Sequence, residues 1–356
     1  MNSFRFEMAL LLPALAAASL SLVSTPLIIA LATKKGWFDD QNDPRKIHTG
    51  SIPRLGGIAI FLSFLTAMGL MAAVGIGGFG LSMLPVGLAG VSIFLVGLVD
   101  DFRGLRARFK FALQLLCAVV VVAAGFRFQY LPLPSGNVDI GIFSWPLTIF
   151  WIVGISNAIN MIDGMDGLAG GISLIAAGSF GTLYLALGEK APAAAGLALA
   201  GAIVGFLFYN MPKARIFMGD SGSLFLGFTL ALLPLIGAGK HPREFSVFAA
   251  ATVLAIPIFD VFAAIIRRTK RRKHVMSPDR EHLHHKLLDL GLEPRHILAM
   301  VYAVCLGLGT LAVVAAGSSK LIGFWILITT LTIMVIGFIC LHYLKEVTQK
   351  RTKALF

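Results

Sequence analysis

The chain has 356 residues, of which 57% are hydrophobic and only 13% are charged, and its mean hydropathy is +0.85. Soluble domains carry roughly 25% charged residues, so this composition excludes an ordinary soluble enzyme. The net charge of +12 is compatible with a nucleic-acid partner, but the basic residues lie between apolar stretches, as they do in membrane proteins. The composition therefore predicts a polytopic membrane protein that binds no nucleic acid.

Eleven apolar stretches recur along the chain, and a membrane-spanning helix needs about 20 such residues. The first stretch is too long for the apolar part of a signal peptide, which has about 7–15 residues. We therefore expect an all-α fold in one integral-membrane domain, residues 1–356. The expected spans are 8–32, 55–74, 81–99, 111–126, 145–160, 168–187, 192–210, 221–238, 246–266, 297–316 and 321–342.

The distribution of Lys and Arg predicts the orientation of these spans, because cytoplasmic loops are enriched in both residues. One set of alternate loops holds 24 of the 30 Lys and Arg residues, and the other set holds six. We therefore expect the N-terminus outside and the C-terminus in the cytoplasm. The segments on the cytoplasmic side are 33–54, 100–110, 161–167, 211–220, 267–296 and the tail from 343.

Two adjacent carboxylates, Asp100 and Asp101, end the third expected span. Adjacent carboxylates repel each other unless a cation or a proton-transfer role uses them. Four basic residues follow between 103 and 110, so a purely structural helix end with compensating charges remains an open alternative for this pair.

The segment NAINMIDGMDGLAGG, residues 157–171, carries the clearest polar pattern in the chain. Asn157, Asn160, Asp163 and Asp166 recur at intervals of three, a spacing that places side chains along one stripe of a helix or tight turn. Amide and carboxylate oxygens are hard ligands that suit Mg²⁺, together with substrate phosphates. The pattern predicts a magnesium site rather than an ordinary turn between two spans.

A third cluster, FMGDSGS at residues 217–223, places Asp220 where the eighth span begins. Small residues at a helix N-terminus favour phosphate binding, and a carboxylate there needs a metal to share the site with phosphate. The GDSG sequence also occurs around protease nucleophiles, but no matching His and Asp order accompanies it here.

The last polar segment, residues 267–291, begins with a basic run typical of a membrane-surface anchor. Downstream, Arg280, His282, His284 and His285 are suited to charge-assisted hydrogen bonds with a diphosphate. The HxHH spacing also permits zinc, although no fourth ligand accompanies it. Within the ninth span, Asp260 is equally compatible with a structural and a catalytic role.

Together these clusters predict metal-assisted phosphoryl transfer at the cytoplasmic membrane surface. The chain resembles the polyprenyl-phosphate N-acetylhexosamine-1-phosphate transferase family along nearly its whole length, most of all the bacterial undecaprenyl-phosphate GlcNAc-1-phosphate transferases. Five motifs carry the resemblance: RKIHTGSIPRLGG (45–57), VDDFRGL (99–105), NAINMIDGMDGLAGG (157–171), FMGDSGS (217–223) and DREHLHH (279–285). One departure is Asn42, where many relatives have a proline.

The resemblance implies a role for each matching residue. Asp220 and Asn160 would hold Mg²⁺, with Mn²⁺ as a substitute, and Asp100 would deprotonate or orient the lipid phosphate with support from Asp101. Asp163 would be the fourth catalytic carboxylate, after Asp100, Asp101 and Asp220. The substrate-binding residues would be Asn157, Asp166, Asn210, Phe217, Arg280, His282, His284, His285, Lys46 and His48, with Asp166, Asn210 and Phe217 placed for the uridine.

The resemblance further implies transfer of GlcNAc-1-phosphate from a UDP-sugar to undecaprenyl phosphate in the bacterial inner membrane, with release of UMP. Another UDP-N-acetylhexosamine, or the phospho-MurNAc-pentapeptide substrate of a sister branch, remains an alternative. Direct attack and a phospho-aspartate intermediate are both open, as is a homodimer. From a different class, a secondary transporter with intramembrane carboxylates is the competing hypothesis, although transporter sites lie near the membrane midplane.

Overall fold

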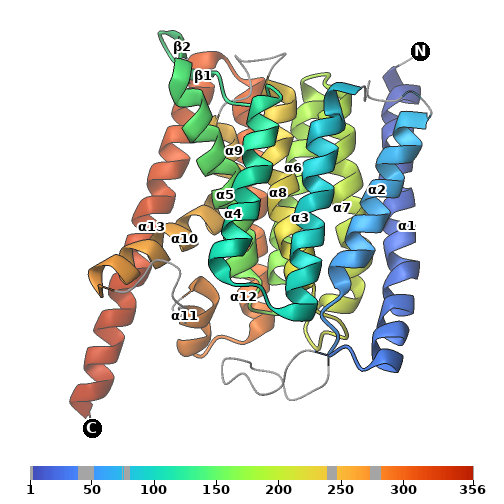
Figure 1. Ribbon diagram of the computed structural model, residues 1–356. Helices are drawn as coiled ribbons and strands as arrows, with labels where there is room; N and C mark the ends of the chain where they lie inside the picture. Colours follow the sequence, from blue (N-terminus) through green and yellow to red (C-terminus); the bar gives the residue numbers. More distant parts are fainter. Residues whose placement is uncertain are drawn as a thin grey trace.

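A bundle of long helices forms the body of the protein, and the two ends of the chain lie at opposite ends of this bundle (Figure 1). The computed structural model describes residues 3–38, 52–73, 75, 81–238, 247–272 and 282–355. The helices are α1 (Ser3–Lys35), α2 (Gly56–Ala73), α3 (Leu84–Arg103), α4 (Ala107–Ala123), α5 (Ser144–Ile162), α6 (Leu168–Ala186), α7 (Lys190–Asn210), α8 (Gly219–Ala238), α9 (Val247–Val253), α10 (Ala255–Lys270), α11 (Leu283–Asp289), α12 (Pro294–Gly317) and α13 (Lys320–Leu355).

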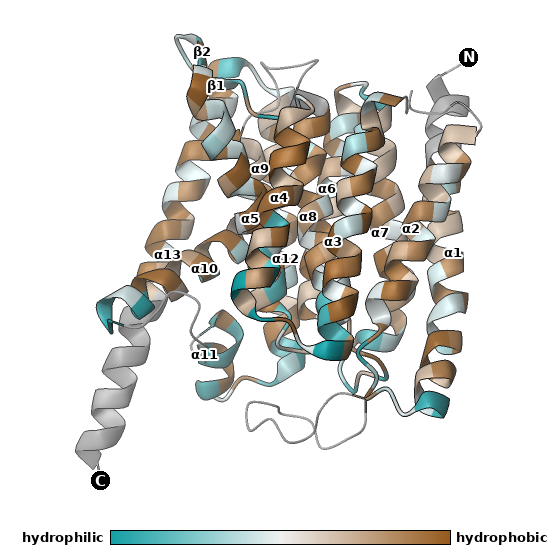
Figure 2. Cartoon of the chain, in the orientation of Figure 1, coloured by the Kyte–Doolittle hydropathy of each residue, from teal (hydrophilic) through white to brown (hydrophobic). Residues whose placement is uncertain are grey.

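Nine of the helices in the described part of the chain are long and apolar enough to cross a membrane, and the bent pair α9–α10 makes a tenth. The prediction of a polytopic all-α membrane protein is confirmed. The remaining expected span corresponds to α4, which has 17 residues. Figure 2 shows that hydrophobic residues dominate the middle of the helices.

The ninth expected span, 246–266, is not one straight helix. It is divided at Leu254 into α9 and α10, whose axes differ by 85°. Pro257 explains the break, because a proline ring clashes with the carbonyl group four residues earlier, here that of Val253. The bend sends α10 sideways across the bundle instead of along it (Figure 1).

A small antiparallel hairpin is the one sheet in the described residues, and the all-α prediction did not include it. Strand β1 (Tyr130–Leu133) pairs with β2 (Gly136–Asp139), with Leu133 opposite Gly136 across a two-residue turn. The hairpin lies at the end of the bundle opposite α11 (Figure 1). It connects α4 to α5 and leaves the helical architecture unchanged.

Helix α8 forms the centre of the bundle. Of its residues between Gly219 and Ile236, 89% are buried, whereas α1 and α13 leave most of their side chains exposed. Helices α2, α3, α5, α6 and α7 pack around it. An exposed apolar surface on the outer helices is what a lipid solvent requires, because hydrocarbon chains take the place of water there.

Two glycines bring α2 and α3 into backbone contact with the first turn of α8. A β-carbon on Gly57 would lie 2.2 Å from the backbone nitrogen of Gly222, and one on Gly97 would lie 2.5 Å from the carbonyl oxygen of Asp220. These distances are too short for any other residue. The two glycines therefore fix how closely α2 and α3 approach the turn that carries Asp220.

We predict that Gly97→Ala destabilises the protein. The added methyl group collides with the α8 backbone, and overpacking of this kind costs about 1–3 kcal/mol. Thermal unfolding in detergent should show a lower Tm for this variant than for the wild type.

Gly154→Ala is the matched control, because a β-carbon there meets no atom within 4 Å and alanine is favoured over glycine in helices by about 1 kcal/mol. Its Tm should be equal to or higher than that of the wild type. Equal Tm values for the two variants would contradict the close-approach interpretation.

Candidate active site

The described parts of the motifs singled out in the sequence come together at one end of the bundle. The predicted loop 100–110 is much shorter than expected, because α3 continues to Arg103 and α4 begins at Ala107. Asp100 and Asp101 therefore lie in the last turn of α3, and Asp220 lies in the first turn of α8. Figure 2 shows hydrophilic residues at these ends of α3 and α4 and on α11.

Asp101 binds the N-terminus of α8. Its two carboxylate oxygens accept hydrogen bonds from the backbone N–H groups of Asp220, at 2.7 Å, and Ser221, at 3.0 Å. A helix leaves such N–H donors unsatisfied at its start. A negative charge near this end also interacts favourably with the helix dipole. Asp101 thus acts as a helix cap supplied by another helix, and both of its oxygens are engaged.

Gly219 makes this arrangement possible. Its φ of +74° lies in the left-handed region, and a β-carbon on it would lie 2.7 Å from an oxygen of Asp101 and 2.2 Å from the carbonyl oxygen of Arg54. Glycine is the residue that adopts this conformation without strain. The glycine of the FMGDSGS motif is therefore required by the geometry around Asp101.

Lys110 joins the carboxylates of Asp100 and Asp220, and the sequence analysis did not assign it a role. Its Nζ lies 2.8 Å from Oδ2 of Asp100 and is also bonded to Oδ2 of Asp220. The other oxygen of Asp100 accepts a hydrogen bond from the backbone N–H of Leu105. Because the ammonium group offsets the repulsion between the two carboxylates, it permits both to be ionised in one small site.

A second cation, Arg54, approaches Asp220 from the segment before α2, with Nη2 at 3.9 Å from Oδ1. Backbone hydrogen bonds hold this segment against the FMGDSGS motif: the Phe217 N–H donates to the Pro53 carbonyl, and the Gly56 N–H donates to the Phe217 carbonyl. The two motifs thus form one unit. The signal for Arg54 was present in the sequence as part of RKIHTGSIPRLGG.

The two asparagines of the 157–171 motif have different environments. Nδ2 of Asn160 donates to the Ser223 hydroxyl at 2.8 Å, which leaves its Oδ1 oriented as the acceptor. Nδ2 of Asn157 donates to Gln114 on α4 at 2.5 Å and to the Val153 carbonyl at 2.8 Å. Asn160 therefore lies beside the first turn of α8, whereas Asn157 also links α5 to α4.

Asp163 lies directly after α5 and is partly buried. Burial, followed by the nearby Asp220 carboxylate, raises the pKa of Asp163 to about 7, while Arg54 acts in the opposite direction. Its carboxyl group is thus less readily ionised than an ordinary aspartate. A cation bound nearby favours the ionised form, as opposite charges do.

Asp166 and Asn210 connect the loop after α5 with the loop after α7. Asp166 accepts a hydrogen bond from the Ala214 N–H at 3.0 Å, and Asn210 accepts one from the Gly167 N–H at 3.1 Å while donating to the Ile216 carbonyl at 2.9 Å. Both side chains are buried. These bonds hold the segment after α5 against the segment after α7. The substrate-binding role predicted for both residues is a separate expectation.

His284 lies against the turn after Asp163. A β-carbon on Gly164 would be 2.7 Å from its Nε2, and the imidazole is 2% exposed. Burial, and secondarily His285 and His282, lower the pKa of His284 to about 3, so the ring is neutral at pH 7. Within the described residues neither ring nitrogen has a hydrogen-bond partner, which marks His284 as a group prepared for a ligand.

Asp260 on α10 fixes the start of residues 282–285, here called the histidine segment. One oxygen lies 2.8 Å from Nδ1 of His282, and the other accepts a hydrogen bond from the Leu283 N–H, also at 2.8 Å. Because a carboxylate accepts, we assign the proton to Nδ1, which leaves Nε2 available to a ligand. The ring planes of His282 and His284 are nearly parallel, with centroids 6.2 Å apart.

Three predicted substrate-binding residues, Lys46, His48 and Arg280, lie outside the described residues. The other predicted site residues lie on α3, α5, α7, α8 and α11 or in the short segments that join the helices at this end of the bundle. Their individual roles stay predictions.

The donor set at Asp220 and Asn160 suits Mg²⁺, which takes one or two protein carboxylates and completes its shell with water and substrate phosphate. In the described part of the chain no three His, Cys, Asp or Glu side chains are grouped as metal ligands. Lys110 shows that the site between Asp100 and Asp220 accommodates positive charge.

Residues 83–238 match the model of glycosyl transferase family 4. The chain is 37% identical over 287 residues to a probable undecaprenyl-phosphate N-acetylglucosaminyl 1-phosphate transferase of Bacillus subtilis, covering 80% of this chain and 78% of the relative. It is 36% identical over 336 residues to a decaprenyl-phosphate N-acetylglucosaminephosphotransferase of Mycobacterium tuberculosis, covering 87% of this chain and 82% of the relative.

The chain belongs to the polyprenyl-phosphate N-acetylhexosamine-1-phosphate transferase family. The undecaprenyl-phosphate alpha-N-acetylglucosaminyl 1-phosphate transferase of Escherichia coli is more distant, at 28% identity over 80% of this chain and 78% of the relative. The resemblance seen in the motifs is confirmed, and the secondary-transporter hypothesis loses its support. The coarse activity, a transferase that acts at a membrane, follows from this membership.

We predict that Lys110→Met lowers the activity of this transferase by at least about 10²-fold, the usual effect of removing one preorganised charge from an active site. Without the ammonium group, the carboxylates of Asp100 and Asp220 repel each other, and one takes up a proton. Lys110→Arg should retain part of the activity because it restores the charge. Initial rates with purified, correctly folded variants measure the effect.

Arg108→Met is the control, because Arg108 lies in the same turn of α4 and its side chain is exposed. It should retain nearly full activity. Equal losses in the two methionine variants would show that the net charge of the segment, rather than the Lys110 bridge, is what matters.

We further predict that Asp260→Asn weakens the use of the donor substrate about 10- to 100-fold, the usual effect of removing the partner that orients a functional histidine. The loss should fall mainly on KM for the donor, since His282 stays in place but its ring is no longer held. Asp139→Asn, which alters an exposed carboxylate on the distant hairpin, should have no effect. A loss of Tm without a change in KM would reduce Asp260 to a structural role.

Proposed function

We propose that this protein transfers N-acetylglucosamine-1-phosphate from UDP-N-acetylglucosamine to undecaprenyl phosphate and releases UMP, the first membrane step of a cell-envelope glycan pathway. The observation that carries the proposal is the meeting of Asp100, Asp101 and Asp220 with Lys110 at one end of a membrane-spanning bundle. The names of the relatives, which specify N-acetylglucosamine and a polyprenyl phosphate, support the choice of substrates.

Asp100 is suited to act on the lipid phosphate. Its carboxylate is held by Lys110 and the Leu105 N–H, so it is oriented and ready to accept a proton. In the proposed reaction an oxygen of the lipid phosphate attacks the β-phosphorus of the donor and loses its proton to Asp100. The bond from this phosphorus to the bridging oxygen breaks, and UMP leaves with the electron pair.

The donor would lie between the first turn of α8 and the histidine segment. Arg54 and Lys110 supply positive charge for the diphosphate. The neutral ring of His284 offers one donor and one acceptor, which suits sugar hydroxyl or acetamido groups, while Nε2 of His282 is available to a phosphate oxygen. Asn157, Asp166, Asn210 and Phe217, together with Lys46, His48, Arg280 and His285, complete the proposed binding residues.

Mg²⁺ would be held by Asp220 and Asn160 and would supply charge neutralisation on the donor phosphates when bound. Asp163, with its pKa near neutrality, would stay ionised beside it. Asp101 contributes by fixing the N-terminal turn of α8, and therefore the direction of the Asp220 carboxylate.

We also propose eleven membrane crossings with the N-terminus outside and the active site in the cytoplasm, in the plasma membrane of a bacterium. The excess of Lys and Arg in the segments at the active-site end supports this orientation. The positions of the two chain ends at opposite ends of the bundle (Figure 1) agree with an odd number of crossings. α4 and the bent pair α9–α10 would supply the tenth and eleventh crossings.

Purified protein supplied with undecaprenyl phosphate, UDP-N-acetylglucosamine and Mg²⁺ should release UMP and form a lipid-linked product. Chelation of the metal should stop the reaction, and Asp220→Asn should lower the rate by about 10²–10³-fold. In membrane vesicles, only those with the cytoplasmic face outward should consume external donor, because the UDP-sugar does not cross the bilayer.

Asp139→Asn serves as the control carboxylate and should retain the wild-type rate. A panel of other UDP-sugars separates substrate choice from reaction type: release of UMP with a different N-acetylhexosamine would change the sugar but keep the reaction. No metal-dependent UMP with any donor would overturn the proposal.

A further inference from the structure

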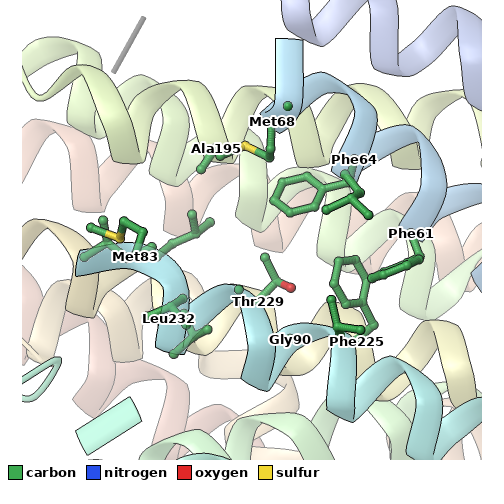
Figure 3. A pocket seen from close by; sticks show the side chains of 16 residues that line it. Phe61, Phe64, Met68, Met83, Gly90, Ala195, Phe225, Thr229 and Leu232 are labelled. Atoms are coloured by element: carbon green, nitrogen blue, oxygen red, sulfur yellow. The ribbon is translucent and has the colours of Figure 1, made fainter. Parts of the chain in front are cut away.

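A lateral slot opens between α2 and α3 in the half of the bundle away from the carboxylates. It has a volume of about 310 Å³, and α8 forms its floor. Figure 3 shows Phe64 and Met68 of α2, Gly90 of α3, and Thr229 and Leu232 of α8 around this space. Figure 1 shows why it exists: α2 leans away from α3 along its length.

The walls of the slot are almost entirely apolar. Of the side chains that line it, only the Thr229 hydroxyl carries an oxygen or nitrogen atom. A headgroup, a nucleotide or a sugar would leave its polar groups unsatisfied there. The slot therefore suits a hydrocarbon chain.

Glycines create the width of the slot. Gly69, Gly87 and Gly90 line it, and a β-carbon added to any of them would meet no atom within 4 Å. These glycines thus have no close helix packing to explain them, unlike Gly57 and Gly97. A larger side chain at any of these positions would therefore project into the open space of the slot.

An aromatic cluster closes the end of the slot that points toward the active site. The rings of Phe61 and Phe94 stack with centroids 3.9 Å apart, and Phe225 meets Phe61 edge-on at 5.2 Å. This cluster lies one to two turns from Gly57, Gly97 and Asp220. A polyprenyl chain whose phosphate lies at Asp100 would have to pass this cluster to enter the slot.

The length of the slot matches one leaflet of a membrane. Its floor runs from Phe225 to Ile236, which is about 16 Å at 1.5 Å per residue, and half of a hydrocarbon core is about 15 Å. The rim continues into the lipid-facing surface, where Leu65 and Leu88 are 47% and 58% exposed. A chain of the surrounding lipid can therefore enter sideways without leaving the membrane.

We propose that this slot binds one acyl chain of a membrane phospholipid, from the leaflet opposite the active site. The chain separates α2 from α3 and supports their packing on α8. Since α2 begins and α3 ends beside the carboxylate cluster, the bound lipid stabilises the site from a distance. The inference does not depend on the proposed reaction.

The test uses full-length protein in lipid nanodiscs that contain a phospholipid with a photoreactive diazirine in its acyl chain. After illumination, mass spectrometry of peptides should place adducts on α2, α3 and α8 around Met68, Met83 and Leu232. The double variant Gly87→Leu/Gly90→Leu fills the slot and should lower this labelling about tenfold, because a well-packed space does not admit further methylenes.

Gly307→Leu is the matched control, since Gly307 is an exposed glycine of α12 with open space around it, and it should label the slot as the wild type does. A second arm uses undecaprenyl phosphate with the diazirine near the end of its tail. Stronger labelling by this probe than by the phospholipid would assign the slot to the acceptor and overturn the proposal. Slot labelling no stronger than that of the lipid-facing residues of α12 would also overturn it.

Discussion

The two hydrogen bonds between the Asp101 carboxylate and the Asp220 and Ser221 N–H groups in the first turn of α8 are the interaction on which the rest of the site depends. It joins the end of α3 to the start of the central helix, and Gly97 and Gly219 permit the close approach that it needs. A buried helix start without such a partner would leave its N–H groups unsatisfied at a large free-energy cost. Asp220 projects from this turn, so its direction is set by the same interaction.

The candidate active site consists mainly of helix ends and tight turns rather than long loops. Asp100, Lys110 and Asp220 come from the ends of three helices, and Asp166 and Asn210 tie two short turns together by buried hydrogen bonds. Groups held in this way need little reorganisation when charge develops on a transferring phosphoryl group, and preorganisation is a large part of electrostatic catalysis.

The bend at Leu254 brings part of the ninth expected span into contact with the histidine segment. α9 runs along the bundle, whereas α10 crosses it and brings Asp260 to His282 and Leu283. A straight span would carry Asp260 along the bundle axis instead. Pro257 therefore does more than break a helix, because the bend places the Asp260 carboxylate against His282 and Leu283.

The sequence by itself determined the membrane class, the positions of the spans and the carboxylate motifs, because composition, apolar length and the spacing of polar residues are local properties. The tertiary structure decided which of these residues meet. The Lys110 bridge to Asp220, the capping of α8 by Asp101 and the Asp260–His282 pair each join residues distant in the chain, and no local pattern encodes such contacts. The lipid slot likewise arises from the divergence of two helices, which depends on packing against α8.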